Sequence, residues 1–510
     1  MRVNTLSVAV TAAAVFTGAA EASTPHHPKA KNFIYVVPDG YGIASQVMAR
    51  DYQSVMNGEG TVERPNTAKI GVDNMVLGTV RTQASDNLVT DSSASGTAFA
   101  CGVKTYNGAV SVDDDGMPVG SILEAAHLDG FKTGLVVTSR ITHATPAVYS
   151  SHVLDRGSEN EIAAQQIGKT HPFGPFVDLL IGGGRRHYLP ESEGGTREDD
   201  VNLIEWAIEQ GYTYAEDASD LKEASGKKGR VPLPFLGLFN LTHISYEMDR
   251  DPESEPSLLE TTKIALDTLE AATKKSKKGY FIMVEASRID HAGHANDAPA
   301  HIHETLMFNE VMNYIKEYIE KHPDTQMLSA ADHECGGLTL IDGFDPTVLA
   351  RAQYSNDYLM AMFDNYNGDD RATFLRDEVV PLYGLGNYTD ATIQEFLNIY
   401  EQEDTAAMGL AILKAVAKEG GVNWSTGGHT AADVVLHGYA KGKKYDEMKR
   451  AIGGNQNNIN LPGYIEKVLG LKMEKATKAL RKGGVGWVEK RDQLSAIKRR
   501  AEAAAMDHAH

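Results

Sequence analysis

The residues with the clearest chemical potential form a run of acidic, hydroxyl and small side chains at positions 90–97, Thr-Asp-Ser-Ser-Ala-Ser-Gly-Thr. Asp91 and Ser92 stand side by side where the small residues predict the tight start of a helix. The first N–H groups of a helix and its dipole attract anions, so a phosphate can approach Ser92 closely there. The same cluster is also typical of an ordinary helix N-cap, and taken alone the run leaves both interpretations open.

Metal-ligand side chains occur in three further clusters, which contain Glu285, Asp290 and His294, then Asp332 and His333, and finally His429 in a glycine-flanked loop. Asp290 and His294 are spaced i, i+4, so one helical turn places both on the same face. Carboxylate and imidazole groups together suit zinc, whereas hydroxyl and carboxylate oxygens suit magnesium. Together with the serine run, these clusters predict a dinuclear metal site for phosphoryl transfer.

Short apolar runs precede most of these polar residues, at positions 33–37, 133–137, 280–284 and 326–330. Their length and their flanking turn residues predict buried strands, and the stripes at 258–269 and 306–319 predict helices between them. The alternation predicts an α/β fold with a large, mostly parallel central sheet and helices on both faces. Ligands in such folds bind beyond the carboxyl ends of the strands, so the clusters are expected to form one site.

The ends of the chain differ from its centre. Arg2, an apolar stretch at 6–20 and the Ala-Glu-Ala sequence at 20–22 predict a signal peptide over residues 1–22. The apolar stretch is short and rich in small residues, which argues against the alternative of a membrane anchor. The mature protein is therefore expected to be exported, to a periplasm or to the medium.

The rest of the chain divides into a predicted catalytic domain at 31–440 and a basic, helical C-terminal tail at 441–510. Between about 341 and 423 the strand–helix rhythm weakens, which predicts a crown-like insertion over the active face.

Composition excludes several partners. The 510 residues carry a net charge of -20, which argues against a nucleic-acid surface or an anionic membrane. Bound metal ions can invert the local field, so a small anionic substrate stays compatible with this charge. Cys101 and Cys335 are the only cysteines, and the sequence leaves open whether they are bridged or free.

These motifs closely resemble those of the alkaline phosphatase family, over nearly all of the mature chain. The segments 89–95 and 101–108 match the region of that family's nucleophile, and 178–185 matches a strand followed by a glycine turn. The glycines of this last segment lack the G-x-G-x-x-G spacing of a dinucleotide-binding loop.

The resemblance implies a role for each matching residue. Ser92 corresponds to the nucleophile, and Arg156 to the arginine that grips the phosphate, with Asp91 orienting it. Two zinc ions and one magnesium ion are implied: the first zinc bound by Asp290, His294 and His429, the second by Asp39, Asp332 and His333, and the magnesium by Asp39, Thr145 and Glu285.

Two positions depart from the best-known bacterial pattern of the family. His143 stands where that pattern has Asp, and His291 where it has Lys, while other branches carry His at both positions. Because residue 143 has no carboxylate, the third metal site, formed by Asp39, Thr145 and Glu285, is expected to hold magnesium less tightly or to accept zinc or cobalt. The resemblance also implies a homodimer.

The predicted function is hydrolysis of phosphate monoesters through a phosphoseryl intermediate. A phosphodiesterase of the same superfamily is one alternative, which Arg156 disfavours because it suits a dianionic monoester. A sulfatase is another, but Ser92 lacks the C/S-x-P-x-R context. A secreted phosphate- or metal-binding protein without turnover is the alternative from a different class.

Overall fold

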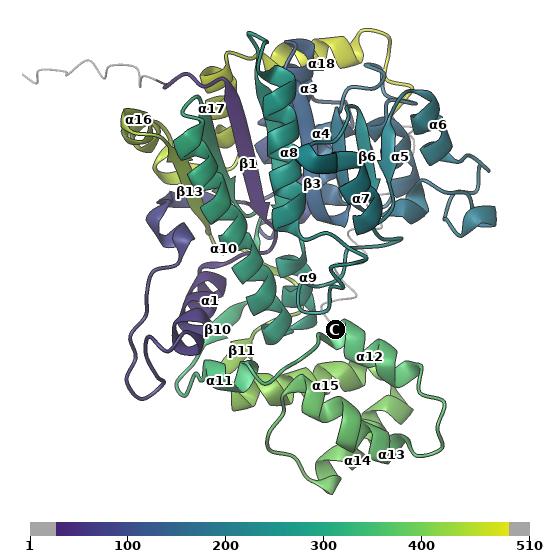
Figure 1. The fold of residues 1–510 in the computed structure, drawn as a ribbon, viewed down its shortest axis with the longest axis vertical. Helices are drawn as coiled ribbons and strands as arrows, with labels where there is room; N and C mark the ends of the chain where they lie inside the picture. Colours follow the sequence, from purple (N-terminus) through teal and green to yellow (C-terminus); the bar gives the residue numbers. More distant parts are fainter. Residues whose placement is uncertain (1–26, 489–510) are drawn as a thin grey trace, which may run out of the picture.

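A 10-stranded sheet forms the centre of the computed structural model, which describes residues 27–488 (Figure 1). Its strand order is β14-β2-β13-β8-β1-β7-β3-β4-β6-β5. The strands are β1 (Asn32–Pro38), β2 (Val76–Arg81), β3 (Lys132–Arg140), β4 (Leu179–Gly183), β5 (Thr213–Ala215), β6 (Phe235–Leu238), β7 (Tyr280–Ala286), β8 (Thr325–Ala330), β13 (Val434–Ala440) and β14 (Gly454–Asn457). The predicted signal peptide, residues 1–22, lies outside the described residues.

The four predicted strands are confirmed as β1, β3, β7 and β8, which are neighbours in the sheet and mutually parallel. Every residue of β1, β7 and β8 is buried, as expected for strands covered on both faces. β13 runs antiparallel to both of its neighbours, β2 and β8, so the sheet is mixed but mostly parallel.

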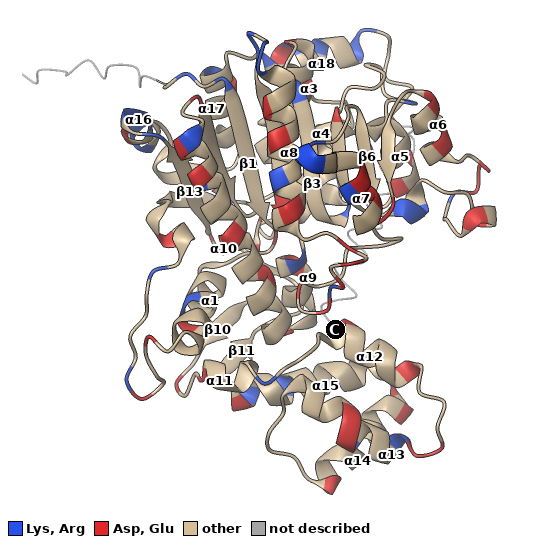
Figure 2. Cartoon of the chain, in the orientation of Figure 1, with Lys and Arg blue, Asp and Glu red and all other residues tan. Residues whose placement is uncertain are grey.

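Helices cover both faces of this sheet. On one face, Tyr35 of β1 packs against Phe99 of α2 (Ser92–Cys101) and Tyr149 of α4 (Ala144–Ser150). On the other face lie the two predicted helices, confirmed as α8 (Leu258–Thr273) and α10 (Ala298–Lys321). Charged residues occur along α8 and α10 in Figure 2, whereas β1 carries none, and the apolar residues Leu266 and Leu269 of α8 and Ile315 of α10 are buried.

The region from 346 to 419 is mainly helical, and its Leu359, Phe363 and Met408 belong to a second apolar cluster, which also includes Met48 and Ile302 from outside the region. Its α-helices are α11 (Pro346–Leu349), α12 (Asn356–Asp364), α13 (Arg371–Phe374), α14 (Asp390–Gln402) and α15 (Thr405–Glu419). In Figure 1 these helices lie at the end of the molecule toward which β1 points. Their assignment as an insertion in the catalytic domain stays a prediction.

The chain beyond 441 packs onto the main core. It forms α16 (Lys443–Ile452), strand β14, α17 (Asn460–Leu469) and α18 (Met473–Arg481), and β14 adds to the sheet edge beside β2. Leu461 and Ile465 of α17 are fully buried. Within residues 27–488, none of the helices combines the length and the apolar character that crossing a membrane requires.

Candidate active site

Adjacent parallel strands bring the predicted metal ligands together at one edge of the sheet. Asp39 directly follows β1, and Glu285 near the end of β7 stands opposite Val37 in the register. Asp332 and His333 follow β8, on the other side of β1. All four of these polar side chains are fully buried, so the sheet topology itself builds a charged pocket in the protein interior.

Helix α9 (Arg288–Ala295) follows β7 and carries Asp290 and His294 on one face, as the i, i+4 spacing predicts. Oδ2 of Asp290 lies 3.3 Å from Nε2 of His294. Gly40 makes this close approach possible: its φ is +71°, and a Cβ at this position would lie 2.6 Å from the Cα of Asp290. Only glycine fits between β1 and α9 here.

The serine run begins α2 as predicted. Asp91 is the N-cap, and its Oδ1 accepts a hydrogen bond of 2.9 Å from the backbone N–H of Ala94. Ser92 is the first residue of the helix and is 1% exposed. Its Oγ lies 3.1 Å from Nε2 of His333, which joins the helix N-terminus to the ligand clusters.

Asp91 also holds the arginine that the sequence predicts to bind phosphate. Nη1 of Arg156 donates to Oδ2 of Asp91 at 3.1 Å, and the same oxygen accepts from the backbone N–H of Gly108 at 3.0 Å. Burial alone would raise the pKa of Asp91, but Arg156 and the hydrogen bonds from Ser93 and Ala94 lower it below its ordinary value. The carboxylate therefore stays ionised, and it holds the guanidinium of Arg156, whose side chain is a quarter exposed, at the residue before Ser92.

The ring nitrogens of His294 and His429 lie close enough together to bind one cation. His294 donates from Nδ1 to the carbonyl of Gly427 at 2.7 Å, and His429 donates from Nδ1 to the carbonyl of Thr90 at 2.8 Å. Their Nε2 atoms lie 3.0 Å apart, and in the neutral rings both atoms carry lone pairs. Burial would lower the pKa of His294, but Asp290 raises it to about 9, so a proton is held on this ring when no cation is bound; a metal ion can replace the proton and accept both lone pairs, so the donor set fits a metal.

Each carboxylate of the cluster also has one oxygen without a hydrogen-bond partner. Oδ1 of Asp39, Oδ1 of Asp290, Oδ2 of Asp332 and Oε1 of Glu285 are buried without a hydrogen bond. Burial, reinforced by Asp332, Asp290 and Glu285, raises the pKa of Asp39 well above its ordinary value. Burial chiefly, and Asp332 beside it, raise the pKa of Glu285 to about 7. Uncompensated carboxylates in the protein interior are costly unless cations bind there.

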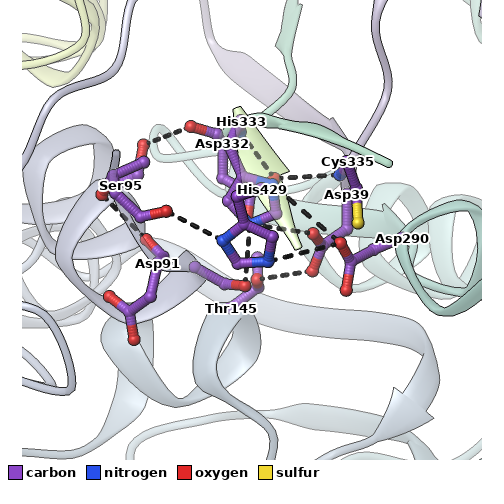
Figure 3. A network of polar contacts seen from close by, with 12 residues as sticks. Asp39, Asp91, Ser95, Thr145, Asp290, Asp332, His333, Cys335 and His429 are labelled. Atoms are coloured by element: carbon purple, nitrogen blue, oxygen red, sulfur yellow. Dashed lines mark hydrogen bonds and ion pairs between the residues drawn. The ribbon is translucent and has the colours of Figure 1, made fainter. Parts of the chain in front are cut away.

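Thr145 is the second residue of α4, five residues beyond the end of β3, and its Oγ1 is 3.4 Å from Oδ2 of Asp39. This distance places the hydroxyl beside Asp39, as predicted for the third metal position. Figure 3 shows Asp39, Asp290, Asp332, His333 and His429 converging from separate segments, with Thr145 and Asp91 beside them.

His143 and His291 lie next to this position, with ring centroids 5.5 Å apart. Nε2 of His143 is 3.1 Å from Nη2 of Arg156, and His143 is the N-cap of α4, two residues before Thr145. His243 completes a group of three, 4.2 Å from His291. His243 was not predicted from the sequence, although it follows the short apolar run of β6 within five residues.

Three further residues were missed. Asn107 accepts a hydrogen bond from the backbone N–H of Asp91 at 2.9 Å, and Ser95 donates to the carbonyl of Asp332 at 2.7 Å. Asn107 lies within the motif 101–108 and Ser95 within the serine run, so both were visible as neighbours of the nucleophile. Cys335 lies among the predicted ligands of the first metal, Asp290, His294 and His429. Both Cys101 and Cys335 are free and buried, which settles the alternative that the sequence left open.

The chain is similar to known phosphatases along most of its length. The alkaline phosphatase family matches residues 30–471. A repressible alkaline phosphatase of Saccharomyces cerevisiae is 37% identical over 481 residues, which cover 89% of this chain and 84% of the yeast protein. The crystal structure of Thermus thermophilus alkaline phosphatase has a TM-score of 0.74 at 26% identity, over 89% of this chain and 96% of that one.

An alkaline phosphatase from Schizosaccharomyces pombe is 35% identical over 466 residues, covering 89% of this chain and 84% of its own. The chain therefore belongs to the alkaline phosphatase family. It is a phosphatase with a metal-binding site, and its mixed, mostly parallel sheet is the fold of that family.

Proposed function

We propose that this chain hydrolyses phosphate monoesters, with Ser92 as the nucleophile. One observation carries the proposal: the Ser92 hydroxyl stands at the N-terminus of α2, 3.1 Å from His333, and faces buried carboxylates that lack hydrogen-bond partners. An anionic substrate at this point meets the backbone N–H groups of α2 and the guanidinium of Arg156.

The residues present fit three metal positions. Asp290, His294 and His429 would hold the first zinc, Asp39, Asp332 and His333 the second, and Asp39, Thr145 and Glu285 a magnesium ion. When bound, these ions supply Lewis acidity and favour the ionised forms of the oxygen nucleophiles and leaving groups. The lone pairs of His294 and His429 and the orphaned oxygens of the carboxylates support this assignment.

Ser92 attacks the phosphorus atom and displaces the alcohol, which leaves a phosphoserine on the enzyme. Arg156 binds two non-bridging oxygens of the phosphoryl group through its planar fork, a geometry that lysine does not match. Asp91 keeps this fork in place by its ion pair and is itself held by Gly108, Ser93 and Ala94. Water then cleaves the phosphoserine and releases inorganic phosphate.

The third metal position is the one at which this chain departs from the best-known bacterial pattern of the family. His143 stands beside it, and burial together with Arg156 lowers the pKa of His143 well below its ordinary value, so the ring is neutral. A neutral imidazole does not attract a hydrated magnesium ion as a carboxylate does. We therefore propose that this position binds magnesium weakly and accepts zinc or cobalt. A TAB5 alkaline phosphatase mutant, similar to this chain at 25% identity and a TM-score of 0.59, has Mg bound in its M3 site.

A phosphodiesterase is the second candidate within the superfamily, and Arg156 argues against it. The guanidinium is fixed by Asp91 close to Ser92, where it matches the double negative charge of a monoester. A phosphate- or metal-binding protein without turnover would not need the Ser92 hydroxyl in contact with His333.

The test compares hydrolysis of an aryl phosphate monoester, a diester and a sulfate ester by the same preparation, before and after chelation. We expect the monoester to be preferred, chelation to abolish turnover, and zinc with or without magnesium to restore it. Full activity in protein shown by elemental analysis to be metal-free would refute the metal-dependent mechanism.

Export of the mature chain and a homodimer belong to the same proposal. Cell fractionation with N-terminal sequencing tests the first, since cleavage before Ser23 is expected. Sedimentation equilibrium tests the second.

A further inference from the structure

A free thiol lies inside the cluster assigned to the first metal. Cys335 stands in the short strand β9 (Glu334–Cys335), directly opposite His429 in β12 (His429–Thr430). Its Sγ and one ligand atom each of Asp290, His294 and His429 all lie within 4.8 Å of one another. In Figure 3 the sulfur lies beside the Asp290 carboxylate.

The backbone around Cys335 is firmly held. Its N–H donates to the carbonyl of Gly40 at 3.0 Å, and the N–H of Gly336 donates to the carbonyl of Gly428 at 2.9 Å. On α9, a Cβ at Gly293 would lie 3.1 Å from Sγ of Cys335. The absence of a side chain at 293, between Asp290 and His294, therefore leaves the space that the thiol fills.

A second observation points to a ligand at the same place. Oδ1 of Asp290 has no hydrogen-bond partner, and the residue is only 3% exposed. Nε2 of His429 lies 3.7 Å from this oxygen. The carbonyl of Gly428 lies 3.8 Å from Sγ of Cys335, which is long for a hydrogen bond, and burial together with the nearby Asp290 carboxylate raises the pKa of the thiol. One common space is therefore surrounded by four possible ligand atoms: Oδ1 of Asp290, Nε2 of His294, Nε2 of His429 and Sγ of Cys335.

We propose that Cys335 is a fourth protein ligand of the metal held by Asp290, His294 and His429. Zinc binds thiolate readily alongside imidazole and carboxylate. Ligation replaces the S–H bond by a sulfur–metal bond and releases the thiol proton to solvent. The inference rests on the proposed metal site.

The arrangement leaves room for a substrate. Cys335 is fully buried, whereas the side chain of His294 is 41% exposed, so the cluster is open to solvent at His294. A zinc ion with four protein ligands can add a fifth one from the open side. The sulfur also makes the site softer, so it favours thiophilic cations such as cadmium over a site with oxygen and nitrogen ligands alone.

The test replaces the metals of the full-length enzyme by Co(II) and records the absorption spectrum. A cobalt–thiolate bond gives a charge-transfer band in the near ultraviolet, separate from the visible d–d bands of any bound Co(II). We expect this band in the wild type and in C101S, and its loss in C335S. Cys101 is the matched control because it is also a buried free thiol, and its Sγ donates a hydrogen bond to Oγ of Ser111 at 3.2 Å.

A competition titration adds a readout that a packing role does not move. In C335S we expect cadmium affinity to fall by at least about tenfold more than zinc affinity, as the loss of a soft donor predicts. Visible d–d bands without the charge-transfer band in the wild type would overturn the inference and leave the proposed function intact. A wild type that binds no Co(II) would contradict both.

Discussion

Replacing Arg156 by alanine removes the group that we assign to phosphate recognition. In the structure its Nη1 donates to Asp91 and its Nη2 lies 3.1 Å from His143, while its backbone N–H donates to Gly108 at 2.8 Å and survives the replacement. Asp91 keeps its bonds from Ala94, Ser93 and Gly108. The lost ion pair is partly exposed, so unfolding free energy should fall by only about 1 kcal/mol.

The kinetic loss should be larger. Removing one charged donor at a transition state costs about 3 kcal/mol, or on the order of 10²-fold in kcat/KM for a monoester. A diester carries one negative charge fewer on the phosphoryl group, so its turnover should suffer less. Arg156→Lys keeps the charge but loses the planar fork, and we expect an intermediate loss.

The assay measures kcat/KM for an aryl monoester and a diester, inhibition by inorganic phosphate, and urea unfolding for the wild type and both variants. Weaker inhibition by phosphate should accompany the loss of monoester turnover. Equal losses on the two esters, or an unfolding change as large as the kinetic one, would mean that Arg156 holds structure and does not bind the dianion.

Two more replacements test how the fold supports the site. Gly40→Ala should displace Asp290 and weaken zinc binding by at least about tenfold in a chelator competition. The control is Gly58→Ala: Gly58 also has a positive φ, +72°, but no atom lies within 4 Å of an added Cβ, so this change should cost about 1 kcal/mol of stability and leave zinc binding unchanged. Equal zinc affinities in the two variants would refute the steric argument. The Glu124 carboxylate is buried in contact with His152 and His171. Burial would raise the pKa of Glu124, but the two imidazoles hold it well below its ordinary value. The ionised carboxylate therefore stabilises the fold above about pH 4.3, and this stabilisation is lost as the pH falls further. Glu124→Gln should therefore lower the free energy of unfolding at pH 7 by about 3–5 kcal/mol. In urea titrations the difference in unfolding free energy between variant and wild type should shrink from about pH 5 to pH 3. A difference that does not change with pH would contradict the ion pair.

The strand ends explain why so much of the site could be predicted from the sequence. The apolar runs before Asp39, Glu285 and Asp332 are long enough to identify as buried strands, and parallel strands present their carboxyl ends at one edge. Asp91 and the spacing of Asp290 and His294 rest on local helix geometry, which needs no knowledge of the rest of the fold. The predicted strands and helix positions were confirmed, whereas the metal-binding and catalytic roles of these residues stay proposals.

The missed features depend on contacts between segments distant in sequence. Cys335 reaches the cluster through a pair of two-residue strands with His429, and strands this short have no periodic pattern. His243 joins His143 and His291 only because β6 lies two strands away from β3. Strand β14, with its sequence Gly-Asn-Gln-Asn, has no apolar residue and was not predicted for the same reason.

Identifying the residue that carries phosphate during turnover tests the central claim most directly. The enzyme is mixed with a labelled phosphate monoester, quenched in acid within the first turnovers, digested and mapped by peptide. We predict label on Ser92 and none in Ser92→Ala. Label on Ser93 or Ser95, or turnover without any labelled peptide in a rapid quench, would contradict the assignment of Ser92 as the nucleophile.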